Sequence, residues 1–137
     1  MAQLACILEA SAPKPGNVSP GRPFADLRYE DFVASAIAIG RAFEGVGAQH
    51  LGRTVRAAIE STLEWAPSNT NLGIVLLLAP LARAVPNSVR EVLNATTVDD
   101  ARDVYRAIRL ARPGGLGTSD AQDVADEPTM TLLEVMC

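Results

Sequence analysis

The chain has 137 residues, of which 48% are hydrophobic and only 4% aromatic, and its formal charge at pH 7 is −4. This length suits one domain of ordinary size, and a core built from Ala, Leu, Ile and Val favours packed helices over a β-sandwich. The acidic balance argues against a nucleic-acid partner, whereas an anionic small molecule stays compatible with a local positive site.

Several classes of site and segment are disfavoured by residues that the chain lacks. Cys6 and Cys137 lie near opposite ends, which indicates neither a disulfide framework nor a metal site. His50 is the only histidine, which argues against a histidine zinc site and a Ser-His-Asp triad. The N-terminus lacks the pattern of a signal peptide. The most apolar run, residues 72–81, is shorter than the about 20 residues of a membrane span. We therefore expect a cytoplasmic protein without a membrane partner.

The first half of the chain predicts helices separated by a loop rich in breakers. Apolar residues at helical spacing predict a helix over residues 2–11, another from Tyr29 to about residue 43 that weakens at Gly40, and a third over residues 51–65. Residues 12–26 hold four prolines and two glycines, which predicts a long ordered loop or a linker.

The second half begins with a break at Pro67, and residues 72–82 then predict a helix that is apolar all round. Such a helix belongs at the centre of a bundle. Ser88 and Thr97 are predicted to cap two further helices that extend to about residues 93 and 111.

The last segment predicts a loop over residues 112–127 and a final helix whose first position is Pro128. Its apolar face comprises Leu132, Leu133 and Met136. The sequence thus predicts a single all-α domain over residues 1–137, a helical bundle with a central apolar helix and long functional loops. Because an apolar-faced helix without a cap is a poor end for a domain, we expect partner helices beyond Cys137, and a homo-oligomer is among the expected states.

The most specific motif lies in the first loop, where Pro13 and Pro15 flank Lys14, the single lysine beside eleven arginines. The prolines restrict the backbone and Gly16 permits a tight turn. A lysine held in this way is a point charge suited to a phosphate. On composition alone, an ordinary proline-rich linker with a solvated lysine remains the alternative.

A second motif, Asn69-Thr70-Asn71-Leu72-Gly73, stands at the predicted start of the apolar helix. Free backbone N–H groups at a helix N-terminus favour phosphate, and Asn and Thr side chains add donors. Simple helix capping uses the same residue types and remains the alternative. The motif is not a Walker A loop, because no Gly-Lys-Ser/Thr follows a strand.

A third motif combines Gly114 and Gly115 with Asp120 and Asp123. Carboxylates spaced in this way can hold Mg²⁺ together with waters and substrate phosphates. A glycine-rich connector with solvated acids is the alternative, and Asp26 has the same two interpretations. Of the remaining candidates, Asp31 is interpreted as a first-turn dipole partner, His50 as a cap of the third helix and Cys6 as a core residue.

Taken in chain order, three segments resemble the triphosphoribosyl-dephospho-CoA synthase family. They are Pro13-Lys14-Pro15-Gly16, then Asp26-Leu27 leading to Phe32 and Ser35-Ala36, then Asn69-Thr70-Asn71-Leu72-Gly73. The resemblance implies an all-α transferase that moves the triphosphoribosyl group of ATP to 3′-dephospho-CoA, releases adenine and serves prosthetic-group biosynthesis. It also implies ATP and a dephospho-CoA-like molecule as partners, with Mg²⁺ as cofactor.

The resemblance also implies roles for individual residues. Lys14 would contact the triphosphate, Asn69 and Thr70 would bind phosphate or dephospho-CoA, and Asp26 would serve Mg²⁺ or the ribose. The expected site comprises Asp26 and Asp120 as catalytic residues, Lys14, Gly16, Asn17, Asn69, Thr70, Asn71, Gly73, Gly114 and Gly115 as ATP or substrate ligands, and Asp26, Asp120 and Asp123 as metal ligands.

Two positions depart from the family pattern. Asn17-Val18-Ser19 stands where members typically have Leu-Val-Asp, and Phe24 stands where they tend to have a histidine. These departures keep open a related nucleotide-dependent transferase with another acceptor, and a non-catalytic helical fragment. Displacing adenine at the ribose C1′ requires a held triphosphate, a positioned acceptor hydroxyl and a carboxylate near the developing positive charge.

Overall fold

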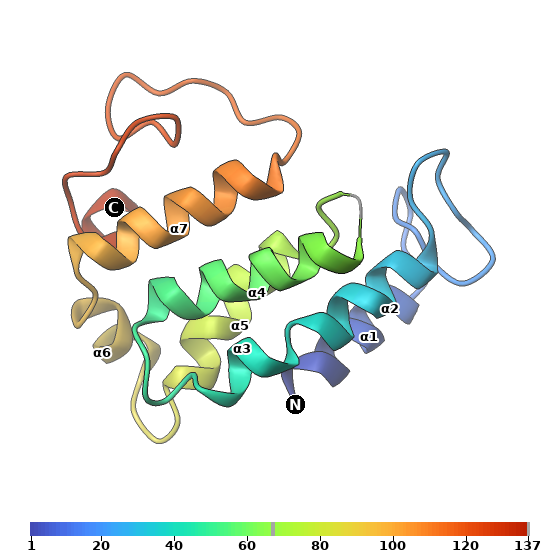
Figure 1. Cartoon of the computed structure of the whole chain (residues 1–137), viewed down its shortest axis with the longest axis horizontal. Helices are drawn as coiled ribbons and strands as arrows, with labels where there is room; N and C mark the ends of the chain where they lie inside the picture. Colours follow the sequence, from blue (N-terminus) through green and yellow to red (C-terminus); the bar gives the residue numbers. More distant parts are fainter. Residues whose placement is uncertain (67, 137) are drawn as a thin grey trace.

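The computed structural model describes residues 1–66 and 68–136, and at Met136 the backbone alone. The predictions made for Pro67, Cys137 and the Met136 side chain lie outside the described residues. Within them the fold is all-helical, as predicted, and the extended pairing is an isolated bridge between Ser19 and Arg22. The helices are α1 (Ala2–Ser11), α2 (Tyr29–Ala38), α3 (Gly40–Glu44), α4 (Leu51–Trp65), α5 (Leu72–Arg83), α6 (Val89–Asn94), α7 (Val98–Ala111) and α8 (Leu132–Met136) (Figure 1).

Helix α4 forms the centre of the bundle, since α2, α3, α5 and α7 all pack against it. Its inward face repeats apolar residues at helical spacing, and Val55, Ala58 and Ile59 are at most 2% exposed. Figure 1 shows α7 running alongside α4. No helix within the described residues is long and apolar enough to cross a membrane.

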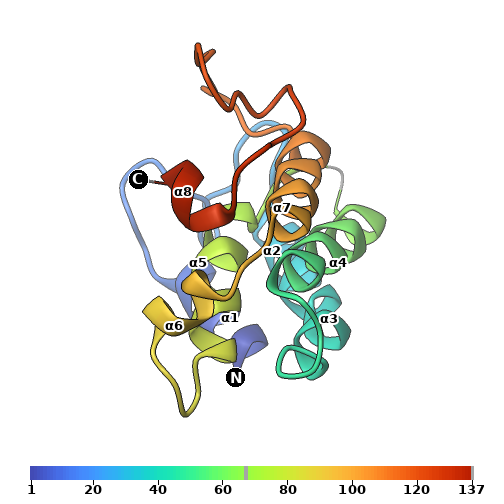
Figure 2. The same ribbon diagram turned by 90° about the vertical axis from the view of Figure 1, so that its left-hand side faces the viewer.

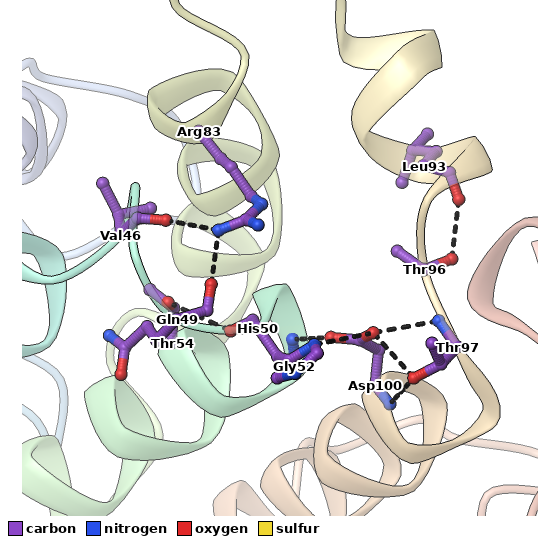
Figure 3. Close-up of polar contacts among 10 residues, drawn as sticks. All are labelled: Val46, Gln49, His50, Gly52, Thr54, Arg83, Leu93, Thr96, Thr97 and Asp100. Carbon is purple, nitrogen blue, oxygen red and sulfur yellow. Dashed lines mark hydrogen bonds and ion pairs between the residues drawn. The ribbon is translucent and has the colours of Figure 1, made fainter.

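Helices α4 and α7 approach each other closely at their N-terminal ends. Asp100, which is 3% exposed, accepts a hydrogen bond from the Gly52 backbone N–H at 2.8 Å. Its other oxygen accepts from the backbone N–H and the hydroxyl of Thr97 at 2.9 and 3.0 Å (Figure 3). A single carboxylate therefore satisfies donors at the start of both helices. A Cβ at Gly52 would lie 2.3 Å from the Asp100 carbonyl oxygen, so only glycine fits there.

His50 occupies the N-cap position of α4, but the prediction that its side chain caps the helix is wrong. Its side chain is 78% exposed and makes no capping hydrogen bond. Asp100 has taken over that role, and His50 Nδ1 lies 3.9 Å from its carboxylate. Beside it, Arg83 donates to the carbonyls of Val46 and Gln49 and so ties the turn before α4 to α5 (Figure 3).

Other local predictions are confirmed. The hydroxyl of Ser88 accepts the Glu91 N–H at the start of α6, and that of Thr97 accepts the Asp100 N–H at the start of α7. Asp31 accepts the Arg28 N–H at 2.8 Å and so helps to begin α2. Cys6 is a core residue with 5% exposure.

Helix α5 is present where predicted, but it is not buried all round. Leu72, Val75 and Ala79 face the core, whereas Leu77 and Leu81 are 67% and 53% exposed. Because α4 occupies the centre, α5 has packing partners on one side and leaves its other face open.

The prediction that the final helix starts at Pro128 is wrong, because α8 begins at Leu132. Thr131 sets this start, since its backbone N–H and hydroxyl both donate to the Glu134 carboxylate, at 2.9 and 2.8 Å. Helix α8 lies against α6 and α7 (Figure 2). Leu132, expected on an unpartnered apolar face, is instead 6% exposed within the core.

Candidate functional site

The loop after α1 is an ordered structure built from two proline-glycine turns. In the first, the Asn17 N–H donates to the Lys14 carbonyl at 3.3 Å, and Gly16 has φ +72°. This is the residue order of a type II turn, which requires positive φ at its third position. The buried Val18, 2% exposed, then anchors the loop to the bundle, so residues 12–28 are not a free linker.

Lys14 is held at the end of α1 by an acidic partner. Its ammonium forms an ion pair with Glu9, and the two side chains are 39% and 43% exposed. The proline-flanked lysine therefore stands beside a carboxylate at a half-exposed position.

The segment before α5 is fixed by hydrogen bonds from three neighbouring side chains. Asn69 Oδ1 accepts the Leu72 N–H at 3.0 Å. The Thr70 hydroxyl bonds to the fully buried Ser35 hydroxyl, and the Asn71 amide donates to the Thr62 hydroxyl at 2.9 Å. The helix-capping interpretation of this motif is thus correct for Asn69.

Capping does not use all the donors at the start of α5. Within the described residues, no acceptor is found for the backbone N–H groups of Gly73 and Ile74. Both residues line a cavity of about 240 Å³. Free N–H groups at a helix N-terminus carry partial positive charge and favour an anion.

This cavity, which we call the first cavity, joins the two loops. Its walls come from the end of α1, the proline-glycine loop, α2 and the start of α5, and its lining residues are Glu9, Asn17, Phe32, Asn69, Thr70, Asn71, Leu72, Gly73 and Ile74. Figure 1 shows residues 12–28 and the start of α5 at the same end of the bundle. Segments that lie far apart in the sequence therefore line one cavity.

The predicted site residues divide into two groups. Five of them line the first cavity, namely Asn17, Asn69, Thr70, Asn71 and Gly73, while Lys14 adjoins it through Glu9 and Gly16 forms the neighbouring turn. The other five do not line it: Asp26 is exposed in the first loop, and Gly114, Gly115, Asp120 and Asp123 belong to the loop after α7.

Asp123 has a local structural role in that loop. Its carboxylate accepts the Ala125 N–H at 2.8 Å and the Ser119 N–H at 2.6 Å. These two backbone hydrogen bonds, that of Ala125 first, hold the pKa of Asp123 below its usual value.

The carboxylates predicted for Mg²⁺ are not gathered in one place. Among residues 1–66 and 68–136, no group of three or more His, Cys, Asp or Glu side chains is arranged to hold a metal ion. Asp26, Asp120 and Asp123 therefore do not form a metal cage on their own in this structure. Glu9 is the carboxylate that lines the first cavity.

Sequence reasoning missed Glu9 and the anchoring role of Arg109. Glu9 lies five residues before Lys14 on the last turn of α1, and this spacing was the available signal. The guanidinium of Arg109 donates to the carbonyls of Val124 and Asp126 at 2.8 and 3.0 Å. It fastens the loop after α7 to that helix.

The fold is all-helical, and loop residues and the start of α5 together line the first cavity. The family model of CitG, ATP:dephospho-CoA triphosphoribosyl transferase, matches residues 1–137, and the chain belongs to this family. The membership makes it a transferase-family protein and implies a function of the triphosphoribosyl-dephospho-CoA synthase type. No curated protein and no solved structure matches the chain.

Proposed function

We propose that this protein transfers the triphosphoribosyl group of ATP to 3′-dephospho-CoA and releases adenine. Family membership supports the reaction class and the two substrates. The observation that carries the proposal is the first cavity, in which Asn17 and the Asn69–Gly73 segment, distant in sequence, line one space at a helix N-terminus.

The triphosphate of ATP suits this cavity on chemical grounds. The free N–H groups of Gly73 and Ile74 offer donors and the positive end of the α5 dipole. The Lys14 ammonium, which is paired with the cavity-lining Glu9, adds a full positive charge once it exchanges that partner for the triphosphate.

Because Lys14 is paired with Glu9, binding of ATP to Lys14 would free the Glu9 carboxylate. Both side chains are more than a third exposed, so the pair contributes only about 0–1 kcal/mol and exchanges easily. When the triphosphate takes Lys14 as its partner, the carboxylate of Glu9 is left without a counter-ion beside the cavity. We therefore propose Glu9 as the general base, in place of the predicted Asp26 and Asp120, which do not line the cavity.

In the reaction, the bond between the ribose C1′ and adenine breaks, and a bond from C1′ to an acceptor hydroxyl oxygen forms. Glu9 takes the hydroxyl proton, its negative charge favours the cation-like sugar centre, and the proton leaves finally with adenine. We retain Mg²⁺ as the predicted cofactor. It binds mainly to nucleotide phosphates and water and needs only one or two protein carboxylates, so a protein cage of three carboxylates is not required.

The test is incubation of the protein with ATP, Mg²⁺ and 3′-dephospho-CoA, followed by chromatographic measurement of free adenine. The proposal predicts adenine and the triphosphoribosylated product in equal amounts. Adenine release with a different acceptor alone would favour the related transferase. Absence of turnover with any acceptor would favour the non-catalytic alternative.

A further inference from the structure

A second cavity, of about 440 Å³, shares the lining residue Asn69 with the first. It is bounded by the ends of α4 and α7 and by residues 68–69, and its lining includes Leu63, Ser68, Asn69, Arg109, Leu110 and Arg112. Asn69 lines both cavities, so ligands bound in the two would be neighbours. We call this space the second cavity.

Ser68 brings an unsatisfied donor to the second cavity. Its hydroxyl oxygen is buried and has no hydrogen-bond partner within the described residues. A buried polar group left without a partner is destabilising. Rotation of the Ser68 side chain toward the cavity would let a bound ligand accept its hydrogen bond.

Arg112 brings a charge and a strained backbone. It is the C-cap of α7 in the left-handed conformation, with φ 47° and ψ 53°, where glycine is the favoured residue. No ion pair or side-chain hydrogen bond of its guanidinium is found in residues 1–66 and 68–136. The left-handed backbone is unfavourable for an arginine, and within the described residues no polar contact of this exposed side chain compensates for it.

The neighbouring groups make the same site selective for an anion. Asn69 uses its oxygen for the Leu72 N–H, which leaves its amide N–H groups for a ligand. Arg109 is already occupied by the loop after α7 and by Glu127 at 3.1 Å. The uncompensated positive charge of the second cavity is therefore that of Arg112.

We propose that the second cavity binds the diphosphate group of the acceptor substrate, with Arg112 as the charge partner and Ser68 and Asn69 as hydrogen-bond donors. The identity of the acceptor as 3′-dephospho-CoA rests on the proposed function, but the anion site does not. A third cavity of about 660 Å³ shares Arg109 and Arg112 and is lined by Pro113, Leu116 and Val124. It would take the less polar arm of that substrate.

The test uses Arg112→Gly, because glycine suits the left-handed position and a loss of binding then cannot be caused by unfolding. Isothermal titration with 3′-dephospho-CoA should show affinity reduced at least about tenfold, while ATP affinity changes less than about twofold and Tm holds or rises. Ser68→Ala should weaken the acceptor in the same selective way. The control is Arg106→Gln, an exposed arginine on α7 that does not line the second cavity.

Inorganic pyrophosphate, titrated in a Lys14→Gln background that weakens the first cavity, tests the anion site by itself. If Arg112→Gly lowers pyrophosphate affinity while no variant releases adenine, the second cavity stands and the proposed function fails. Unchanged affinity for both pyrophosphate and 3′-dephospho-CoA in Arg112→Gly would overturn the inference. An equal loss of ATP and acceptor affinity would also overturn it, since the two cavities would then not be separate subsites.

Discussion

At the scale of single residues, the proposal for ATP depends most directly on Lys14. Replacing it by Gln removes a charge-assisted contact to phosphate worth about 1.5–3 kcal/mol, which corresponds to a loss of roughly 10- to 150-fold in ATP affinity. Unfolding by urea should hardly change, because the Lys14–Glu9 pair is half-exposed. Calorimetric titration with ATP measures the loss, and Arg90→Gln on the exposed surface of α6 is the control. Equal ATP affinity in the Lys14 and Arg90 variants would contradict the placement of the triphosphate.

A substitution at Gly52 tests the close packing of α4 against α7 at Asp100. In Gly52→Ala the new Cβ would meet backbone atoms of Asp100 at 2.3 to 2.8 Å, so the two helices must separate. Separation also weakens the buried bond from Gly52 to the Asp100 carboxylate. We expect a loss of about 2 kcal/mol or more in the free energy of unfolding, although alanine is the better helix former. Gly47→Ala is the matched control, because that position is open, and a similar effect of both substitutions on urea unfolding would count against this close packing.

At the scale of elements, α5 allows the effect of burial on stability to be measured apart from the hydrophobicity of the side chain. Val75 is 0% exposed and Leu77 is 67% exposed on the same helix. Val75→Ala should cost about 2 kcal/mol of stability through lost burial and a residual cavity. Leu77→Gln, although chemically the larger change, should stay within about 0.5 kcal/mol. Urea unfolding measures the loss of stability in each variant. A larger loss for Leu77→Gln would mean that the outer face of α5 is covered in solution.

The helices show what could be predicted from sequence and what could not. Helix starts with a local cause, such as the Ser88–Glu91 contacts of α6, were predictable because the partners lie three residues apart. The side of α5 that is buried was not predictable, because an almost wholly apolar helix carries no directional pattern. The start of α8 was misplaced because Pro128 and Thr131 both fit a first turn, and the Glu134 carboxylate decided for Thr131.

The same distinction holds for the site. The assignment of the proline-glycine loop and the Asn69 segment to one site came from their resemblance to one family rather than from local physics. The separation of Asp26 from the cavity was not predictable, because loop carboxylates are placed by tertiary packing. The capping of α4 by Asp100 instead of His50 was not predictable for the same reason, because Asp100 belongs to a different helix and is brought there by tertiary packing.

Helix caps predict how stability depends on pH. Hydrogen bonds from the Ser88 backbone N–H first, and then from its hydroxyl, lower the pKa of Glu91 from its ordinary 4.5, and Thr131 lowers that of Glu134 in the same order. Because the folded pKa values are depressed, this stabilisation is present above the unfolded value and is lost as pH falls through the folded one. The urea midpoint should therefore hold between pH 7 and about 5 and fall below about 4.5. A Glu91→Gln, Glu134→Gln double variant should fall less steeply over that range, and an identical slope would refute the cap contribution.

At the scale of the whole molecule, the two cavities share the lining residue Asn69, and five of the helices contribute residues to their walls. The first cavity takes residues from α1, α2 and α5, and the second from α4 and α7. The site geometry therefore depends on whether α1, which carries Glu9, unfolds only together with the other helices.

Cys6 on α1 provides the measurement of that cooperativity. Burial first, and the nearby Glu9 carboxylate second, raise the pKa of its thiol from 9.0 to about 11. At pH 8 the folded protein then holds roughly a hundredfold less thiolate than the unfolded chain, and the side chain is only 5% exposed. In a Cys137→Ser background, alkylation by iodoacetamide should be slow and should accelerate with urea in parallel with global unfolding. If α1 instead opens alone, the alkylation rate will be nearly independent of urea below the unfolding transition, and Glu9 and Lys14 would then be supported by a locally mobile helix.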